Sequence, residues 1–188
     1  MQVRRKIGFV LLGVSLVAGT VMAQQSATSK LQYTYPRIAE YGKVVQFPHA
    51  PQQPRDGSKI VVDITKGGEP DKLNGAIEKV ARFVNIYAGA GKKPASARIA
   101  VVLHGDATLT MLKPEVYAKR FGTDGNPNLD CLRELRKAGV EFFVCGQALS
   151  SKGGTPEEVV DSVDVAVSGL TALVNLQQDG YSYMPMLK

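Results

Sequence analysis

Short apolar runs recur along most of this chain, and residues with helical spacing separate each run from the next. The runs typical of buried β-strands cover residues 60–64, 99–103, 140–144, 163–167 and 181–184. The first two, IVVDI and IAVVL, consist mainly of β-branched and aliphatic residues, which suits strands buried on both faces of a sheet. Strands that alternate with helices need crossover connections. The chain therefore predicts an α/β fold with a mostly parallel sheet covered by helices on both faces.

The segments between these strands carry helix signals. We expect helical stretches over residues 73–88, 108–121, 127–138, 155–158 and 170–176. Pro114 interrupts the second of them, and residues 155–158 (TPEE) form a capping box with proline at the first helical position. Gly89 and Gly180 follow the first and the last stretch, where a glycine readily ends a helix.

Residues 1–23 predict a cleavable signal peptide. Three cations at residues 4–6 precede an apolar stretch at 7–19, and Val21 and Ala23 supply the small residues that a signal peptidase needs for cleavage after Ala23. The apolar stretch is shorter than the roughly 20 residues of a membrane-spanning helix, although an uncleaved anchor is the alternative. No other segment of the sequence is apolar enough to span a bilayer, so we expect no membrane contact after cleavage.

Removing the leader changes the charge balance. The whole chain carries a formal charge of +6, and the leader holds three positive charges and no acid, so the mature chain keeps about +3. Its cations are scattered rather than gathered in a stripe, which argues against nucleic acid as a partner. The remaining length, about 165 residues, suffices for one hydrophobic core and is too short for two full domains.

Residues 24–57 differ in composition from the rest of the chain, since Gln, Ser, Tyr and Pro dominate there. We interpret this segment as an extended arm that packs through its apolar residues, Tyr33, Tyr35, Val44, Val45 and Phe47. A disordered linker over residues 48–57 is the alternative. The expected organisation is a signal peptide at 1–23, a proline-rich arm at 24–57 and an α/β domain at 58–188.

Polar or reactive side chains follow three of the predicted strands. Ligands and chemistry collect at the carboxyl ends of the strands in parallel sheets, so these positions are the candidate site. The candidate pocket residues are Asp63, Lys66, Gly105, Gly146 and Gln147. The candidate catalytic residues are Cys145 and His104.

Cys145 ends an apolar strand and is the most specific of these candidates for a catalytic role. If residues 147–150 turn helically, their free N–H groups would face the sulfur and stabilise a thiolate. His104 could orient or deprotonate that thiol if the second and third strands are neighbours. The structural alternatives are that Cys145 is inert packing and that His104 is only a hydrogen-bonding residue.

Cys131 is the second cysteine of the chain and a candidate redox partner of Cys145. It falls near the start of a predicted helix, and helix and sheet backbones usually lie about 10 Å apart. A disulfide needs Cα atoms closer than about 7 Å. A static bridge between Cys131 and Cys145 is therefore a weaker interpretation than two thiols with separate roles. Because no second ligand stands at close spacing to either cysteine or to His104, we expect no metal and no cofactor.

Several of these residues together carry a resemblance to a known family. They are His104, Gly105, Asn126, Asn128, Leu132, Leu135, Gly139, Val140, Val144, Cys145 and Gly146. In this order they resemble the DsrE/DsrF-like sulfur-relay family over roughly residues 59–188, and residues 135–149 are the most telling segment. The resemblance implies a three-layer α/β/α sandwich with a parallel five-stranded sheet and assembly into trimers or hexamers. It also implies that a strand-end cysteine, matched here by Cys145, accepts sulfur as a persulfide and passes it to a partner protein.

The chain departs from the best-understood members of that family in its leader and its proline-rich arm. Those members are cytoplasmic, whereas the leader places this chain with a periplasmic branch, where cytoplasmic relay partners would be absent. Cys131 matches no functional cysteine of the family.

Three hypotheses follow from the sequence. The first is a periplasmic sulfur-handling protein, a carrier or transferase-like protein rather than an ordinary enzyme, whose sulfur donor and acceptor the sequence does not identify. The second is a non-catalytic oligomeric binding or scaffold module in which Cys145 is structural. The third is a thiol–disulfide role that uses Cys131 and Cys145.

Overall fold

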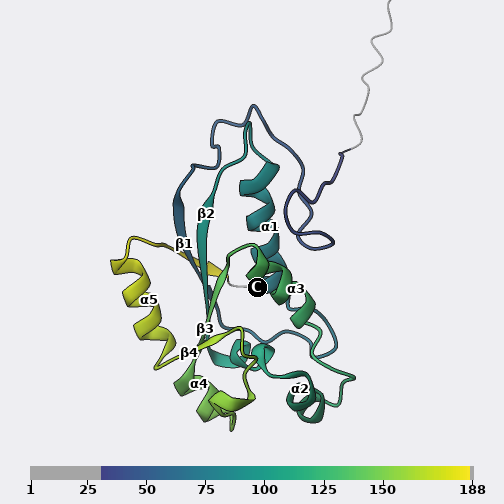
Figure 1. The fold of residues 1–188 in the computed structure, drawn as a ribbon, viewed down its shortest axis with the longest axis vertical. Coiled ribbons are helices and arrows are strands. Elements are labelled where there is room, and N and C mark those ends of the chain that lie inside the picture. Colours follow the sequence, from purple (N-terminus) through teal and green to yellow (C-terminus); the bar gives the residue numbers. More distant parts are fainter. Residues whose placement is uncertain (1–30, 187–188) are drawn as a thin grey trace, which may run out of the picture. The chain divides into compact units, whose positions relative to one another are not determined.

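One parallel sheet organises the residues that the structure describes (Figure 1). The structure is a computed structural model, and it describes residues 31–186. The five strands are β1 (Ser58–Ile64), β2 (Ala97–Leu103), β3 (Glu141–Cys145), β4 (Asp164–Ala166) and β5 (Ser182–Met186). They pair in the order β4-β3-β2-β1-β5, and every pair is parallel. The predicted α/β class and its parallel five-stranded sheet are confirmed.

Helices cover both faces of this sheet. Helices α1 (Gly75–Gly89) and α3 (Leu129–Lys137) pack on one face, and α5 (Gly169–Gln178) packs on the other (Figure 1). The larger core lies under α1 and α3, whereas Val61, Val102 and Leu173 form the smaller core under α5. Because side chains alternate along a strand, every second residue of β1, β2 and β3 faces α5.

The shorter helical elements refine the sequence prediction. The stretch expected at 108–121 divides into a 3₁₀ helix, η1 (Gly105–Met111), and α2 (Pro114–Phe121), which begins at the proline. The capping box opens a 3₁₀ helix, η2 (Pro156–Glu158). Helix α4 (Gly146–Ser151) follows β3 directly, which is the helical turn on which the thiolate interpretation depended.

The predicted signal peptide at 1–23, and the first residues of the arm, lie outside the described residues. In the part of the chain that the structure describes, every helix is too short or too polar to traverse a lipid bilayer.

A single buried asparagine on α1 holds the arm against the domain. The Asn85 Oδ1 accepts hydrogen bonds from the backbone N–H groups of Arg37 and Ile38, both at 2.8 Å. Its Nδ2 donates to the carbonyls of Ile38, Tyr41 and Gly42 at 2.9–3.2 Å. Ile38 is almost fully buried beside these bonds. The side-chain amide of Asn85 thus replaces the backbone partners that this irregular segment lacks.

The apolar residues of the arm divide into two groups. Val44 is buried and pairs with Thr34 in an antiparallel bridge, as packing of the arm requires. Tyr33, Tyr35 and Phe47 are instead among the most exposed large side chains. The expectation that all of them pack inward is wrong for these aromatic residues, because the polar contacts of Asn85 anchor the arm and its aromatic rings stay outside.

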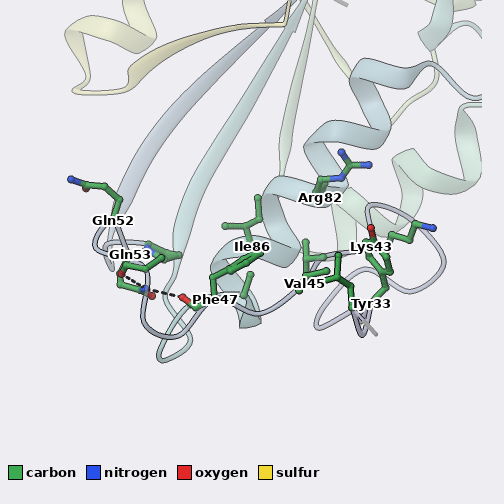
Figure 2. A pocket seen from close by; sticks show the side chains of 14 residues that line it. Tyr33, Lys43, Val45, Phe47, Gln52, Gln53, Arg82 and Ile86 are labelled. Atoms are coloured by element: carbon green, nitrogen blue, oxygen red, sulfur yellow. Dashed lines mark hydrogen bonds between the residues drawn. The ribbon is translucent and has the colours of Figure 1, made fainter. Parts of the chain in front are cut away.

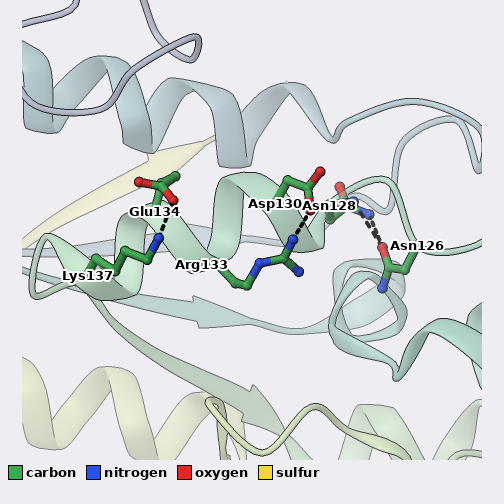
Figure 3. A network of polar contacts seen from close by, with 6 residues as sticks. All are labelled: Asn126, Asn128, Asp130, Arg133, Glu134 and Lys137. Atoms are coloured by element: carbon green, nitrogen blue, oxygen red, sulfur yellow. Dashed lines mark hydrogen bonds and ion pairs between the residues drawn. The ribbon is translucent and has the colours of Figure 1, made fainter.

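A second set of asparagines joins the loops above the sheet (Figure 3). The backbone N–H of Asn74, the residue before α1, donates to Asn128 Oδ1 at 2.8 Å. Asn128 Nδ2 donates to Asn126 Oδ1 at 2.9 Å, and Asn126 Nδ2 donates to the carbonyls of Thr110 and Leu112. These bonds fix the start of α1 and of α3 to the end of η1. The ion pairs on the outer face of α3, such as Glu134 with Lys137, are exposed and contribute little.

We predict that Asn85→Ala lowers the free energy of unfolding by about 3 kcal/mol, since it leaves several buried backbone groups of the arm without partners. Urea denaturation measures the loss, and hydrogen exchange should show that the Ile38 amide loses protection first. Asn175→Ala, at an exposed position of α5, is the control. Equal stability of the two variants would contradict this role of Asn85.

Candidate functional site

Cys145 stands where β3 ends and α4 begins. Its Sγ accepts a hydrogen bond from the backbone N–H of Ala148 at 3.4 Å, so the thiol caps the first turn of α4. The residue is buried, with 7% of its surface exposed. Gly146 is required next to it, because a Cβ there would lie 2.9 Å from the carbonyl oxygen of Ala166 on β4. The geometry supplies one backbone donor to a negative sulfur.

His104 lies beside Cys145. Strands β2 and β3 are neighbours, and Leu103 is the partner of Val144, so the next residue of each strand falls at the same edge of the sheet. The Cβ atoms of His104 and Cys145 would lie 3.2 and 3.4 Å from a Cβ placed on Gly169, the first residue of α5. The condition on which a role for His104 depended, that these two strands are neighbours, is therefore met. Gly169 leaves room for both side chains at the N-terminus of α5.

Asp63 holds the imidazole of His104, and Tyr183 in turn holds Asp63. His104 Nε2 and Asp63 Oδ1 are 2.6 Å apart, and the Tyr183 hydroxyl donates to Asp63 Oδ2, also at 2.6 Å. Asp63 is buried on β1, whereas the His104 side chain is 29% exposed. Because Nε2 donates to the carboxylate, Nδ1 is the ring nitrogen that can accept a proton. Strands β5, β1, β2 and β3 thus contribute Tyr183, Asp63, His104 and Cys145 in spatial order.

The Asp63 carboxylate changes the chemistry of Tyr183. The hydrogen bond that the phenol donates to Asp63 raises the pKa of Tyr183 above its usual value, with added contributions from burial and from the negative charge. The phenol therefore remains a hydrogen-bond donor to Asp63 at neutral pH. Asp63 has both carboxylate oxygens occupied, which fixes its orientation toward His104.

The other candidate pocket residues divide between this site and its surroundings. Gln147 Nε2 donates to the carbonyl of Val167 at 3.3 Å, which ties α4 to the end of β4. Gly105 has a φ of 56°, and a Cβ there would lie 2.9 Å from the carbonyl oxygen of Thr65. Lys66 is exposed and lines a different hollow with Asp106 and Tyr117. The structure thus brings Asp63 to His104 but does not bring Lys66 to Cys145.

Cys131 lies on the opposite face of the sheet, in the core under α1 and α3. It is fully buried, and the described residues contain no disulfide. Burial raises the pKa of the Cys131 thiol to about 12, and the negative charges of Glu78 and Glu134 add to the effect. A thiol in that environment stays protonated and unreactive at neutral pH.

Sequence reasoning missed Tyr183 and Gly169. Tyr183 is 120 residues from Asp63 along the chain and meets it only because β5 pairs with β1. Gly169 carries no chemical group, and its importance is the space that it leaves. Within residues 31–186, no group of three or more His, Cys, Asp or Glu side chains is arranged to hold a metal ion.

Comparison with known proteins adds to this geometry. The model of the DsrE/DsrF-like family matches residues 59–186. The chain belongs to the DsrE/DsrF-like family. Membership in the DsrE/DsrF-like family suggests a sulfur-relay-type role.

This DsrE/DsrF-like protein is also similar to a solved structure. That structure, of a protein of unknown function from Methanobacterium thermoautotrophicum, MTH1491, is 21% identical, with a TM-score of 0.48. The similarity covers 69% of this chain and 99% of that one. The comparison with curated proteins found no match to the chain.

We predict that Tyr183 ionises at higher pH than an unpaired tyrosine and that Asp63→Asn lowers its pKa toward the usual value. The substitution removes the negative charge and the strong acceptor that favour the protonated phenol. NMR of ring-labelled tyrosine across an alkaline titration measures the change, and Tyr35 serves as an internal reference in both proteins. An unchanged Tyr183 titration in Asp63→Asn would contradict the hydrogen-bond chain.

Proposed function

We propose that this protein carries sulfane sulfur as a persulfide on Cys145. The observation that carries the proposal is the position of Cys145, whose sulfur accepts an N–H from the first turn of α4 and which ends the strand next to that of His104, itself held by Asp63. A thiolate is the nucleophilic form of cysteine, and these are the groups that stabilise or generate it. Family membership supports the same class of chemistry.

The loading step is a transfer of one sulfur atom. His104 Nδ1 takes the proton of the Cys145 thiol, and the thiolate attacks the terminal sulfur of a persulfide donor, R–S–SH. A new S–S bond forms on Cys145 as the S–S bond of the donor breaks, and the leaving thiolate RS⁻ receives the proton from the imidazolium. The products are Cys145–S–SH and RSH, with no net oxidation. An acceptor thiolate unloads the sulfur by the same exchange in reverse.

The burial of Cys145 supports a restriction on the donor. Only 7% of the residue is exposed, and α5 begins directly above it at Gly169. A donor that presents a single terminal sulfur atom can reach a buried thiol more easily than a reagent with a bulky group can. The leader expected at residues 1–23 supports export, so donor and acceptor would be periplasmic.

We predict that polysulfide adds about 32 Da, one sulfur atom, to the purified protein, and that Cys145→Ser abolishes the adduct. Peptide mass spectrometry locates the added mass. Cys131→Ala is the matched control and keeps the adduct, because Cys131 is buried with a pKa of about 12. Absence of an adduct on a demonstrably free Cys145 thiol, or its appearance on Cys131, would remove the proposal.

A second candidate function, the oligomeric scaffold, is supported by the surface next to the site. Helix α5 contains no charged residue, and its Leu170 is 75% exposed, one turn before the exposed Val174. Tyr183 of the neighbouring edge strand β5 is also exposed, and its partner in β1, Val61, faces α5, so Tyr183 lies on the same face. Exposed apolar side chains gathered on one face favour burial against another protein surface. We propose that copies of this chain associate through α5 and β5 as a trimer or hexamer.

We predict that Leu170→Lys converts the assembly to monomers, since it places a charge at the centre of the apolar face. Light scattering after size-exclusion chromatography measures the mass. Leu31→Lys changes another exposed leucine, on the arm, and leaves the mass unchanged. A monomeric parent protein would refute the association. A Cys145→Ser variant that keeps every phenotype while oligomeric would favour the scaffold over the sulfur carrier.

The thiol–disulfide hypothesis has no supporting contact. Cys131 and Cys145 lie on opposite faces of the sheet, and only Cys145 has a donor beside its sulfur. We therefore keep the persulfide carrier as the leading proposal.

A further inference from the structure

A hollow of about 600 Å³ lies between the arm and the second half of α1 (Figure 2). Its walls include Val45 and Phe47 of the arm, Ile86 of α1 and Ala90, the residue that follows α1. The last turn of α1 leads into β2, so this hollow lies toward the amino ends of the strands, whereas Cys145 and His104 lie at the carboxyl ends. Ligand pockets commonly have volumes of about 300–1,000 Å³ and mainly apolar linings.

Large apolar side chains around the hollow remain in solvent. Phe47 is 60% exposed and Tyr33 is 52% exposed, although Val44 between them in sequence is buried. The wall that carries Phe47 is nonetheless fixed. Gln53 Nε2 donates to the carbonyls of Phe47 and Ala50, and Gln53 Oε1 accepts from the backbone N–H of Lys92. The hollow is therefore a preformed apolar surface rather than a product of a loose loop.

The charges of the lining have one sign. Lys43 and Arg82 line the hollow, and no Asp or Glu does. Figure 2 shows Lys43 and Arg82 at one side of the hollow, with their charged ends pointing in different directions, and Gln52 and Gln53 toward the other side. Lys43 Nζ lies 4.7 Å from the centre of the Tyr33 ring, and no ion pair joins Lys43 or Arg82 to an acid within residues 31–186. Two cations at one end of an apolar groove complement an anionic group attached to an apolar chain.

From these observations we infer that the groove binds an anionic single-chain amphiphile of the fatty-acid class. The alkyl chain lies along Phe47, Val45 and Ile86, and the carboxylate pairs with Lys43 and Arg82. A concave groove encloses a single chain, whereas adsorption to a bilayer would place these apolar side chains on a protruding surface. This site is independent of the persulfide chemistry at Cys145.

The test is displacement of a fluorescent dansyl-undecanoate from the full mature protein by dodecanoate, below the concentration at which either forms micelles. We expect saturable binding at one site. The double variant Lys43→Gln/Arg82→Gln weakens dodecanoate binding at least about tenfold, the effect of losing charge-assisted contacts. The uncharged glycerol ester of the same acid binds the parent protein more weakly, and the double variant does not change its affinity.

Two further variants keep the result interpretable. Lys119→Gln/Lys137→Gln removes the same net charge elsewhere and leaves the affinity unchanged. Phe47→Ser weakens binding of both the acid and the ester, and its exposed position lets the fold survive. The inference is overturned by absence of displacement, by an equal loss in both double variants, or by capture only on anionic phosphatidylglycerol vesicles. The Cys145→Ser variant, which loses the persulfide adduct, still binds dodecanoate as the parent protein does.

Discussion

The parallel pairing of β1, β2 and β3 determines where Asp63, His104 and Cys145 of the candidate site lie. Each strand contributes one side chain at its carboxyl end, and side-chain alternation turns Asp63, His104 and Cys145 toward α5 rather than toward the larger core. The same alternation sends Val62, Leu103 and Val144 into the core under α1 and α3, so a shift of register would lose packing as well as the site. Stability and chemistry therefore depend on one arrangement of backbone hydrogen bonds.

Outside the sheet, asparagine side chains supply the hydrogen bonds that backbone pairing supplies within it. Asn85 satisfies five backbone groups of the irregular arm, and Asn128 with Asn126 joins loops that have no regular hydrogen-bonding partners. Asparagine suits these places because its amide both accepts and donates within a small volume. The domain thus keeps long non-helical segments whose backbone groups find amide partners, although the Thr34 hydroxyl of the arm is buried without a partner.

The sequence was informative where the pattern is local. Apolar runs located the strands to within a few residues, and Pro114 marked the start of α2. The proximity of His104 to Cys145 followed from a conditional argument about strand order, because apolar patterns do not specify which strands are neighbours. Tyr183 could not be found this way, since its partner is 120 residues away and its strand shows no unusual composition. The prediction that the aromatic residues of the arm pack inward was wrong, because Asn85, a polar residue of α1, holds the arm in place.

The edge position of β5 has a consequence for how the site is completed. Among the elements that the structure describes, β5 comes last in sequence and pairs with β1 alone. A ribosome therefore delivers Asp63, His104 and Cys145 before the residue that orients the first of them. A nascent or truncated chain that ends before Ser182 would hold the thiol and the imidazole but lack the phenol, so the orientation of Asp63 is complete only after β5 has been made.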